Sequence, residues 1–174
     1  GSRLQLIDTV VTGSFEIIQN KQADLAITNT IPKGRLGHAL GSVNIILVCH
    51  PQHELARAPK PMDHNLLLQH LHLVIRDTAA EPKEKAGWLR AEQRWTVNNF
   101  HEALLILKQG LGYCWVPEHL ARPAIAAGEL VHLDIDGGNE RRVNLNLVLA
   151  DPESAGPGTR LLAELLLAHP LKKI

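Results

Sequence analysis

The sequence predicts an α/β fold made of two similar lobes joined by two crossover strands. Short apolar segments of strand length alternate with segments of helical periodicity, which is typical of strand–helix–strand units with parallel strands. The apolar stretch at residues 43–51 is echoed at residues 143–152, and each stretch ends at a proline. Each also precedes a helix-like segment, at residues 63–70 and 159–168 respectively. We therefore expect two half-structures of one topology.

The first strand–helix–strand unit is predicted over residues 4–28. Residues 4–10 (LQLIDTV) are short, apolar and followed by a Thr-Gly sequence, which is typical of a buried strand. Residues 12–14 (TGS) form an N-cap cluster that precedes a short helix. Residues 24–28 (DLAIT) are predicted to be the second strand. Because the connection is helical, we expect the two strands to be parallel.

The second lobe is predicted to repeat this unit around a pair of asparagines. Asn98 and Asn99 follow an apolar strand and stand where a helix would begin, and a single apolar face continues along the next ten residues. Gly110 and Gly112 are expected to end that helix. The strands predicted for this lobe are residues 71–76, 94–98 and 113–117, with a further short helix near residues 88–92.

Composition excludes several classes of protein. The 174 residues are enough for one domain or two small lobes. Lys and Arg number 18 and Asp and Glu number 18, so the zero net charge excludes a basic module that binds nucleic acid through bulk electrostatics. No apolar run has the length of a membrane span, and no signal-peptide pattern is present, so no membrane partner is expected. Two cysteines are too few for a disulfide scaffold, which favours a reduced, cytoplasmic setting.

The sequence lacks the common catalytic and nucleotide-binding motifs. No Gly-x-Gly-x-x-Gly follows a strand, and there is no Walker A sequence and no Gly-x-Ser-x-Gly. Ten histidines raise the question of a metal, and two clusters of them occur, near Cys49 and near residues 64–72. Neither cluster has the spacing of a tetrahedral zinc site. We therefore expect no enzyme activity, no cofactor and no metal.

The polar residues at predicted strand ends each allow two interpretations. Two facing α/β lobes would form a cleft at their strand ends, where helix N-termini suit a carboxylate or another small anion. Asn98 and Asn99 could cap their helix or turn an amide toward such a ligand, and the same alternatives apply to Thr12 and Ser14. Arg76, followed by Asp77, could clamp an anion or form a surface ion pair.

Four segments, in this order and spacing, resemble the effector-binding domain of LysR-type transcriptional regulators. The resemblance covers nearly the whole chain, although no single motif is strong. It implies two Rossmann-like lobes of the periplasmic-binding-protein type II kind, with lobe one at residues 3–47 and 147–174 and lobe two at residues 48–146. The segments that carry it are residues 22–27 (QADLAI), 46–56 (ILVCHPQHELA), 108–117 (KQGLGYCWVP) and 128–133 (GELVHL).

The sequence departs from the family pattern in two respects. The family has a glycine where this chain has Lys21, so Asn20 is expected to take the left-handed position at the end of the first helix. On this resemblance, we expect the given chain to lack the family's N-terminal helix-turn-helix and the first strand and first helix of lobe one. A sheet without that strand would expose unpaired edges.

The resemblance also implies a function, a site and partners. The function is that of a ligand-sensing domain of a bacterial transcription factor, in which a small, anionic effector binds between the lobes. The implied partners are that effector, further copies of the chain in a homodimer or tetramer, and DNA through the absent N-terminal domain alone. The implied effector-binding residues are Thr12, Gly13, Ser14, Cys49, Asn98, Asn99, Phe100 and Val148.

A second interpretation is a free-standing solute-binding protein of the periplasmic type, which shares the two-lobe fold. A signal peptide on a longer natural chain would favour the solute-binding protein, whereas a helix-turn-helix there would favour the regulator. An enzyme on the same architecture ranks third, because it would need an acid–base pair in the cleft and the sequence shows no convincing one.

Overall fold

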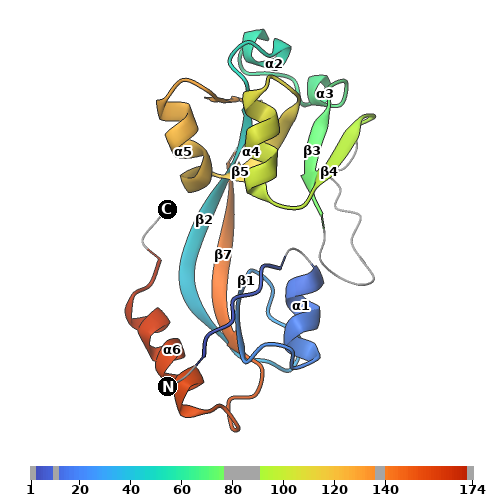
Figure 1. Cartoon of the computed structure of the whole chain (residues 1–174). Coiled ribbons are helices and arrows are strands. Elements are labelled where there is room, and N and C mark those ends of the chain that lie inside the picture. The colour runs from blue at the N-terminus through green and yellow to red at the C-terminus, as the bar shows by residue number, and fades with distance from the viewer. Residues whose placement is uncertain (1–2, 10–11, 77–90, 136–139, 172–174) are drawn as a thin grey trace. The chain divides into compact units, whose positions relative to one another are not determined.

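The computed structural model describes residues 3–9, 12–76, 91–135 and 140–171, with backbone alone for residues 12–15 and 140. The predicted helix near residues 88–92 lies largely outside these ranges. None of the helices in the described ranges has the length and apolarity needed to cross a membrane. The elements in chain order (Figure 1) are α1 (Thr12–Gln19), β1 (Leu25–Thr28), β2 (Gly37–Cys49), α2 (Glu54–Arg57), α3 (His64–Leu67), β3 (His72–Ile75), β4 (Arg94–Val97), α4 (Phe100–Lys108), β5 (Tyr113–Pro117), α5 (Glu118–Ala126), β6 (Val131–His132), β7 (Glu140–Leu149) and α6 (Pro157–Ala168).

The chain divides into two compact α/β units. Unit 1 contains residues 1–43, 77–84 and 143–174, and unit 2 contains residues 44–76 and 85–142. The strand order is β1-β7-β2-β5-β3-β4, with β6 beside β2. The long strands β2 and β7 each begin in one unit and end in the other, as the two predicted crossover strands would.

Unit 1 is a small sheet with one helix on each face. β1 pairs antiparallel with β7, with Leu25 opposite Leu149. Successive side chains on a strand point to opposite faces. Accordingly Val148 packs with Ile18 of α1. Leu147 instead packs with Ala163 of α6.

The strand predicted at residues 4–10 is wrong for the part that the structure describes. Residues 4–9 have no strand conformation, and the expected parallel pairing with β1 is absent from the described residues. The side chains of Leu4 and Leu6 are 67% and 85% exposed. The segment is apolar enough for a buried strand, but a strand also needs a neighbour to hydrogen-bond with, and none of the described strands offers one.

The predicted left-handed cap is also shifted by one residue. Lys21, not Asn20, has the positive φ, at 52°. The Gln22 N–H donates to the Ile17 carbonyl at 2.9 Å, and the Lys21 N–H donates to the Ile18 carbonyl at 3.2 Å, which together form a Schellman motif. The motif requires its left-handed residue at this position in the turn, so the lysine adopts the conformation of the family's glycine.

Unit 2 is built on three parallel strands, as predicted. β3 pairs parallel with both β4 and β5, and β2 pairs antiparallel with β5. Helices α4 and α5 cover one face through a core that includes Leu73, Leu107 and Val116. The short helices α2 and α3 contribute Leu55 and Leu67 to the core on the other face.

Two glycines with positive φ join α4 to β5, where the sequence predicts the helix to end. Gly110 has a φ of 88° and Gly112 a φ of 68°. A Cβ at Gly110 would meet nothing within 4 Å, whereas a Cβ at Gly112 would lie 2.6 Å from the Leu71 carbonyl oxygen. That carbonyl accepts the Tyr113 N–H at 3.0 Å. The close approach of the chain at Gly112 therefore sets β5 beside β3.

Candidate functional site

The carboxyl ends of the three parallel strands of unit 2 lie at one edge of its sheet. In open α/β sheets, ligands bind outside this edge. The residues that directly follow the three strands are Arg76, Asn98 and Glu118, all of them polar. Two helices, α4 and α5, begin at this edge. The candidate site in unit 2 is therefore this polar strand-end edge.

Asn98, Asn99 and Glu102 form a reciprocal cap at the start of α4. The Asn99 Oδ1 accepts the Glu102 N–H at 2.9 Å. The Glu102 carboxylate accepts the Asn98 N–H at 3.0 Å and the Asn98 Nδ2 at 3.1 Å. These hydrogen bonds to its charged form lower the pKa of Glu102. Both asparagines thus have the capping contacts that their position predicts, and Glu102 supplies the third residue of the box.

The cap leaves two backbone donors at the helix start. The first N–H groups of a helix have no acceptor within the helix. Within the described part of the chain, the N–H groups of Phe100 and His101 have no acceptor. The Phe100 side chain packs partly buried against the core beneath α4, which fixes the first turn to the sheet. The positive end of the helix dipole and two N–H donors therefore face the polar edge, an arrangement that suits an anion.

A second polar pair at this edge was missed by the sequence reasoning. The Asn44 Nδ2 donates to the Glu118 Oε2 at 3.2 Å. The register of β2 with β5 places Ile45 opposite Pro117, so Asn44 stands at the edge that Glu118 follows. A polar residue inside the apolar run of β2, and an acid directly after the proline that ends β5, are the signals that could have identified the pair.

Arg76 also belongs to this edge. Its N–H donates to the Val97 carbonyl at 2.8 Å, which extends the pairing of β3 with β4 by one residue. Its side chain is exposed. Asp77, its partner in the alternative ion-pair interpretation, lies outside the described residues.

Cys49 lies at the opposite end of this sheet from Asn98. It is paired with Tyr113, the first residue of β5, whereas Asn98 follows the last residue of β4. The thiol is buried, and burial raises its pKa to about 11. The structure therefore does not bring Cys49 and the asparagine pair together.

The remaining predicted site residues belong to unit 1. Thr12, Gly13 and Ser14 are the first three residues of α1. Val148 is fully buried beneath the same helix, in the core with Ile18. Unit 1 thus holds a predicted helix start and a buried residue that supports that helix from below.

A buried histidine lies at the amino-terminal edge of the unit 2 sheet. The His72 ring stacks on the Tyr113 ring, with centroids 4.7 Å apart and 6° between the planes. It is 2% exposed, and its Nδ1 has no hydrogen-bond partner among the described residues. Burial, with Arg94 and Arg141 nearby, lowers the pKa of His72 to about 4. The ring is therefore neutral at physiological pH.

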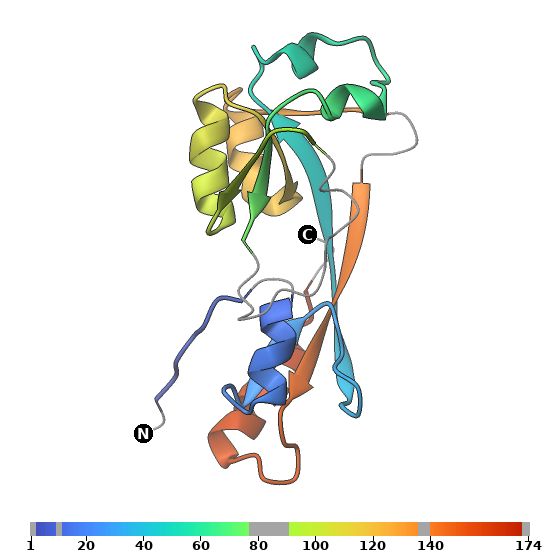
Figure 2. The same ribbon diagram turned by 90° about the vertical axis from the view of Figure 1, so that its right-hand side faces the viewer.

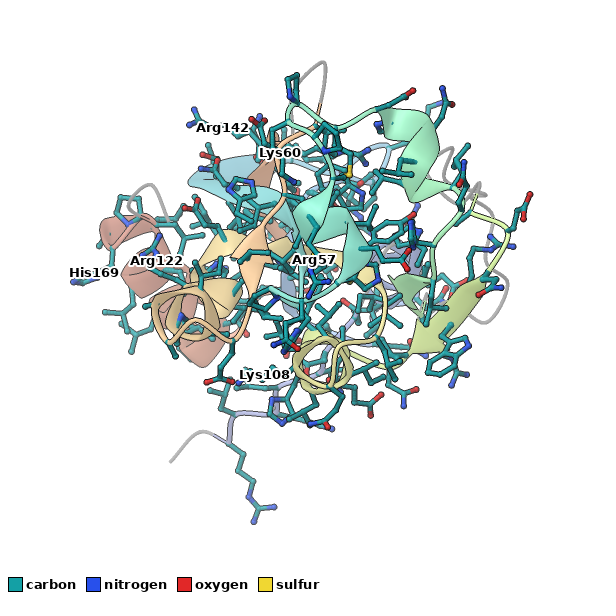
Figure 3. All side chains as sticks on the ribbon, turned by 90° about the horizontal axis from the view of Figure 1, so that it is seen from above. Arg57, Lys60, Lys108, Arg122, Arg142 and His169 are labelled. Atoms are coloured by element: carbon teal, nitrogen blue, oxygen red, sulfur yellow. The ribbon has the colours of Figure 1, made fainter. Side chains whose placement is uncertain are left out.

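The histidines near Cys49 have structural contacts. The Nδ1 of His50 accepts the Gln52 N–H, and the Nδ1 of His53 accepts the Leu55 N–H, each at 3.1 Å. The following turn is closed by Lys60, labelled in Figure 3, whose Nζ donates to the Leu55 carbonyl at 3.2 Å. Among the described residues, no three His, Cys, Asp or Glu side chains converge as a metal site requires.

Replacing Asn99 tests the cap directly. We expect Asn99→Ala to lower the free energy of unfolding by about 1 kcal/mol, because the Glu102 N–H loses its acceptor. Asn99→Ser is the matched control, since its hydroxyl keeps an acceptor at the N-cap, and we expect it to stay near the wild type. Urea titration followed by circular dichroism measures both. Equal losses in the two variants would contradict the capping role.

Comparison with known proteins now defines the class and the family. The fold is that of the two-unit domains of periplasmic-binding-protein type II architecture. The family model of the LysR substrate binding domain matches residues 1–170, so the chain belongs to that family. It is a ligand-sensing regulatory domain of the LysR type.

Individual relatives are distant and mostly longer. The chain is 27% identical over 135 residues to the uncharacterized HTH-type transcriptional regulator YeeY of Escherichia coli, a match that covers 75% of this chain and 44% of YeeY. Full-length LysG from Corynebacterium glutamicum matches with a TM-score of 0.67 and 15% identity, over 96% of this chain and 56% of LysG. The regulatory domain of Synechocystis CcmR, solved in complex with 2-PG, matches with a TM-score of 0.64 and 16% identity, over 88% and 76%. The chain thus spans about half the length of LysG and less than half that of YeeY.

Proposed function

We propose that this domain senses a small anionic effector at the strand-end edge of unit 2, where α4 begins. The observation that carries the proposal is the pair of N–H groups at Phe100 and His101, which have no acceptor within the described residues. An anion at a helix N-terminus accepts such hydrogen bonds and is stabilised by the helix dipole. Among structural neighbours, LysG has been solved with bound effector Arg and CcmR with 2-PG.

Each predicted residue has a distinct role in this proposal. Asn98 and Asn99 hold the helix start in shape, and Phe100 fixes it to the core while its N–H binds the anion. The contribution of unit 1 to effector binding would come from Thr12, Gly13 and Ser14. Two buried residues, Cys49 and Val148, act through packing alone, because neither is accessible to a ligand within its own unit.

In this proposal the domain binds its effector and does not convert it chemically. An effector shifts a conformational equilibrium only through different affinities for the two states. In the proposed mechanism, binding favours one arrangement of the two units, and the change is transmitted to DNA-binding segments of a longer bacterial transcription factor. That factor would act in the cytoplasm as a homodimer or tetramer. The proposal is supported by membership of the family and by the helix start.

A proline substitution tests the N–H donor specifically. Phe100→Pro removes the N–H at the first helical position, where proline is tolerated, and the preceding Asn99 has the extended backbone that proline favours (φ −156°, ψ 170°). Phe100→Ala is the matched control, because it loses the same side-chain packing but keeps the donor. A screen of small carboxylic and phosphorylated acids by thermal shift on the wild type supplies the ligand.

We expect the effector to bind Phe100→Pro about 10- to 100-fold more weakly than Phe100→Ala, because a hydrogen bond to a charged group contributes about 1.5–3 kcal/mol. Isothermal titration calorimetry on the two variants measures the difference. Equal affinities would refute the anion site at α4, and a screen without any stabilising acid would refute the anionic effector.

A further inference from the structure

Glu118 is partly buried at the strand-end edge of unit 2, and its carboxylate has no cation beside it. Its Oε2 accepts the Asn44 Nδ2 at 3.2 Å, but a neutral amide does not compensate a negative charge. Within the described part of the chain no ion pair involves this carboxylate, although Arg76 ends the neighbouring strand and Arg122, labelled in Figure 3, follows one turn later in α5. A charge removed from water is costly unless it is paired. The carboxylate is therefore suited to a cation from outside the chain.

Glu118 lies level with the start of α4 along the sheet. Tyr113 of β5 and Arg94 of β4 are both paired with His72 of β3, and Glu118 and Asn99 each follow five residues after those paired residues. Because β3 lies between β5 and β4, two strand spacings separate the ends of these strands, which is roughly 10 Å. Helix α4 lies within this span, because it packs against β3 and β5 as well as β4. Figures 1 and 2 both show α4 and α5 side by side.

We infer that the effector carries a cationic group as well as its anionic one, and that Glu118 selects for the cationic group. The inference rests on the proposed function and defines the class of ligand for the same site. The anionic group accepts the N–H groups of Phe100 and His101, and the cationic group lies against the Glu118 carboxylate. A ligand with negative charge alone meets repulsion from that carboxylate, because charges at this separation still interact where the site is partly buried. Such repulsion is one means by which a site rejects other ligands.

The spacing of the two groups defines the length of the ligand. Hydrogen bonds of about 3 Å at each end leave roughly 4–7 Å between the two charges of the ligand. An aliphatic chain of about three to five methylene groups spans that distance. The ligand class is therefore a small carboxylate with an ammonium or guanidinium group at the far end of such a chain. Asn44 is a positioning residue in this site, because its amide holds the Glu118 carboxylate.

Isothermal titration calorimetry with matched probes tests the inference. The aminated probes are γ-aminobutanoate, δ-aminopentanoate and ε-aminohexanoate, and each is compared with the plain carboxylate of the same chain length. We expect the best aminated probe to bind the wild type at least about tenfold more tightly than its plain counterpart, because a hydrogen bond to a charged group has an effect of that size. Glu118→Gln should abolish this preference while it keeps an oxygen that accepts the Asn44 Nδ2.

Glu164→Gln is the matched control, since it removes the same charge from an exposed position in α6 of unit 1 and should leave the preference unchanged. Thermal unfolding of both variants verifies that each is folded. Phe100→Pro should weaken both series of probes together, because every probe carries the carboxylate that the Phe100 N–H binds.

The outcomes separate this inference from the proposed function. If plain and aminated carboxylates bind equally and both lose affinity in Phe100→Pro, the anion site stands and selection by Glu118 is refuted. A preference for aminated probes that survives Glu118→Gln also refutes it, as does a wild type that binds none of the aminated probes. If no carboxylate, in these series or in the acid screen, depends on the Phe100 N–H, the proposed site and this inference fail together.

Discussion

We expect Gly112→Ala to lower the free energy of unfolding of the domain by about 3 kcal/mol. Two costs combine at this position. A φ of 68° is unfavourable for any residue with a Cβ, at about 1–2 kcal/mol. The new Cβ would also lie 2.6 Å from the Leu71 carbonyl oxygen, which is backbone and must move, and displacing packed atoms costs a further 1–3 kcal/mol or so. Because the same carbonyl accepts the Tyr113 N–H, the shift also disturbs the start of β5.

Gly110→Ala is the matched control for this prediction. Gly110 lies two residues away and also has a positive φ, but a Cβ there would meet nothing within 4 Å. It should therefore incur the backbone cost alone, about 1–2 kcal/mol. Urea denaturation of the two variants separates the steric cost from the conformational one. If both lose the same stability, the contact with Leu71 is not what requires glycine at position 112.

The second large effect is a loss of stability in acid that depends on His72. The pKa of this ring is lowered from 6.5 to about 4 in the folded domain, chiefly by burial. Below pH 6.5 the His72 ring is protonated in the unfolded chain but stays neutral in the folded domain. The free energy of unfolding therefore falls as pH falls toward 4. The shift corresponds to at most about 3 kcal/mol across that interval. Above pH 6.5 the contribution is fully present.

His72→Phe should remove most of this dependence. The substitution keeps an aromatic ring against Tyr113 and eliminates the Nδ1 that lacks a hydrogen-bond partner among the described residues. Urea denaturation at pH 7, 6, 5 and 4 should give a flatter profile for the variant than for the wild type. NMR titration of the His72 ring protons in the wild type provides an independent measure of the pKa. An unchanged acid slope in His72→Phe would assign the dependence to other groups.

Local patterns predicted the elements of unit 2 well, because each is a short apolar run or an apolar helical face with a cap or a glycine at its end. The strands β3, β4 and β5 and the helix α4 were all predicted within one or two residues. Prediction failed where the outcome depends on a distant partner. Residues 4–9 have the composition of a strand, yet without a neighbouring strand they have no strand conformation, and residues 4–8 are exposed.

The helix α5 and the Asn44–Glu118 pair were harder to predict, because local sequence patterns determine neither of them. Helix α5 contains Pro123, which local rules associate with a break. The predicted cap at Asn99 follows from residue type and position alone. The Asn44–Glu118 pair joins residues 74 positions apart, so it depends on the register of β2 with β5, which no local pattern determines. The same register separates Cys49 from Asn98, although the family resemblance grouped them.

The burial of both native cysteines makes the chain well suited to spectroscopic labelling. The thiolate is the reactive form, and burial raises the pKa of Cys49 to about 11 and that of Cys114 to about 12. We therefore expect maleimide dyes at neutral pH not to react with either native thiol. The substitutions Leu36→Cys in unit 1 and Leu120→Cys in unit 2 would each add an exposed thiol, one for a donor fluorophore and one for an acceptor. Both native cysteines could stay in place. Energy transfer between the dyes would then follow the effector response in solution, one molecule at a time.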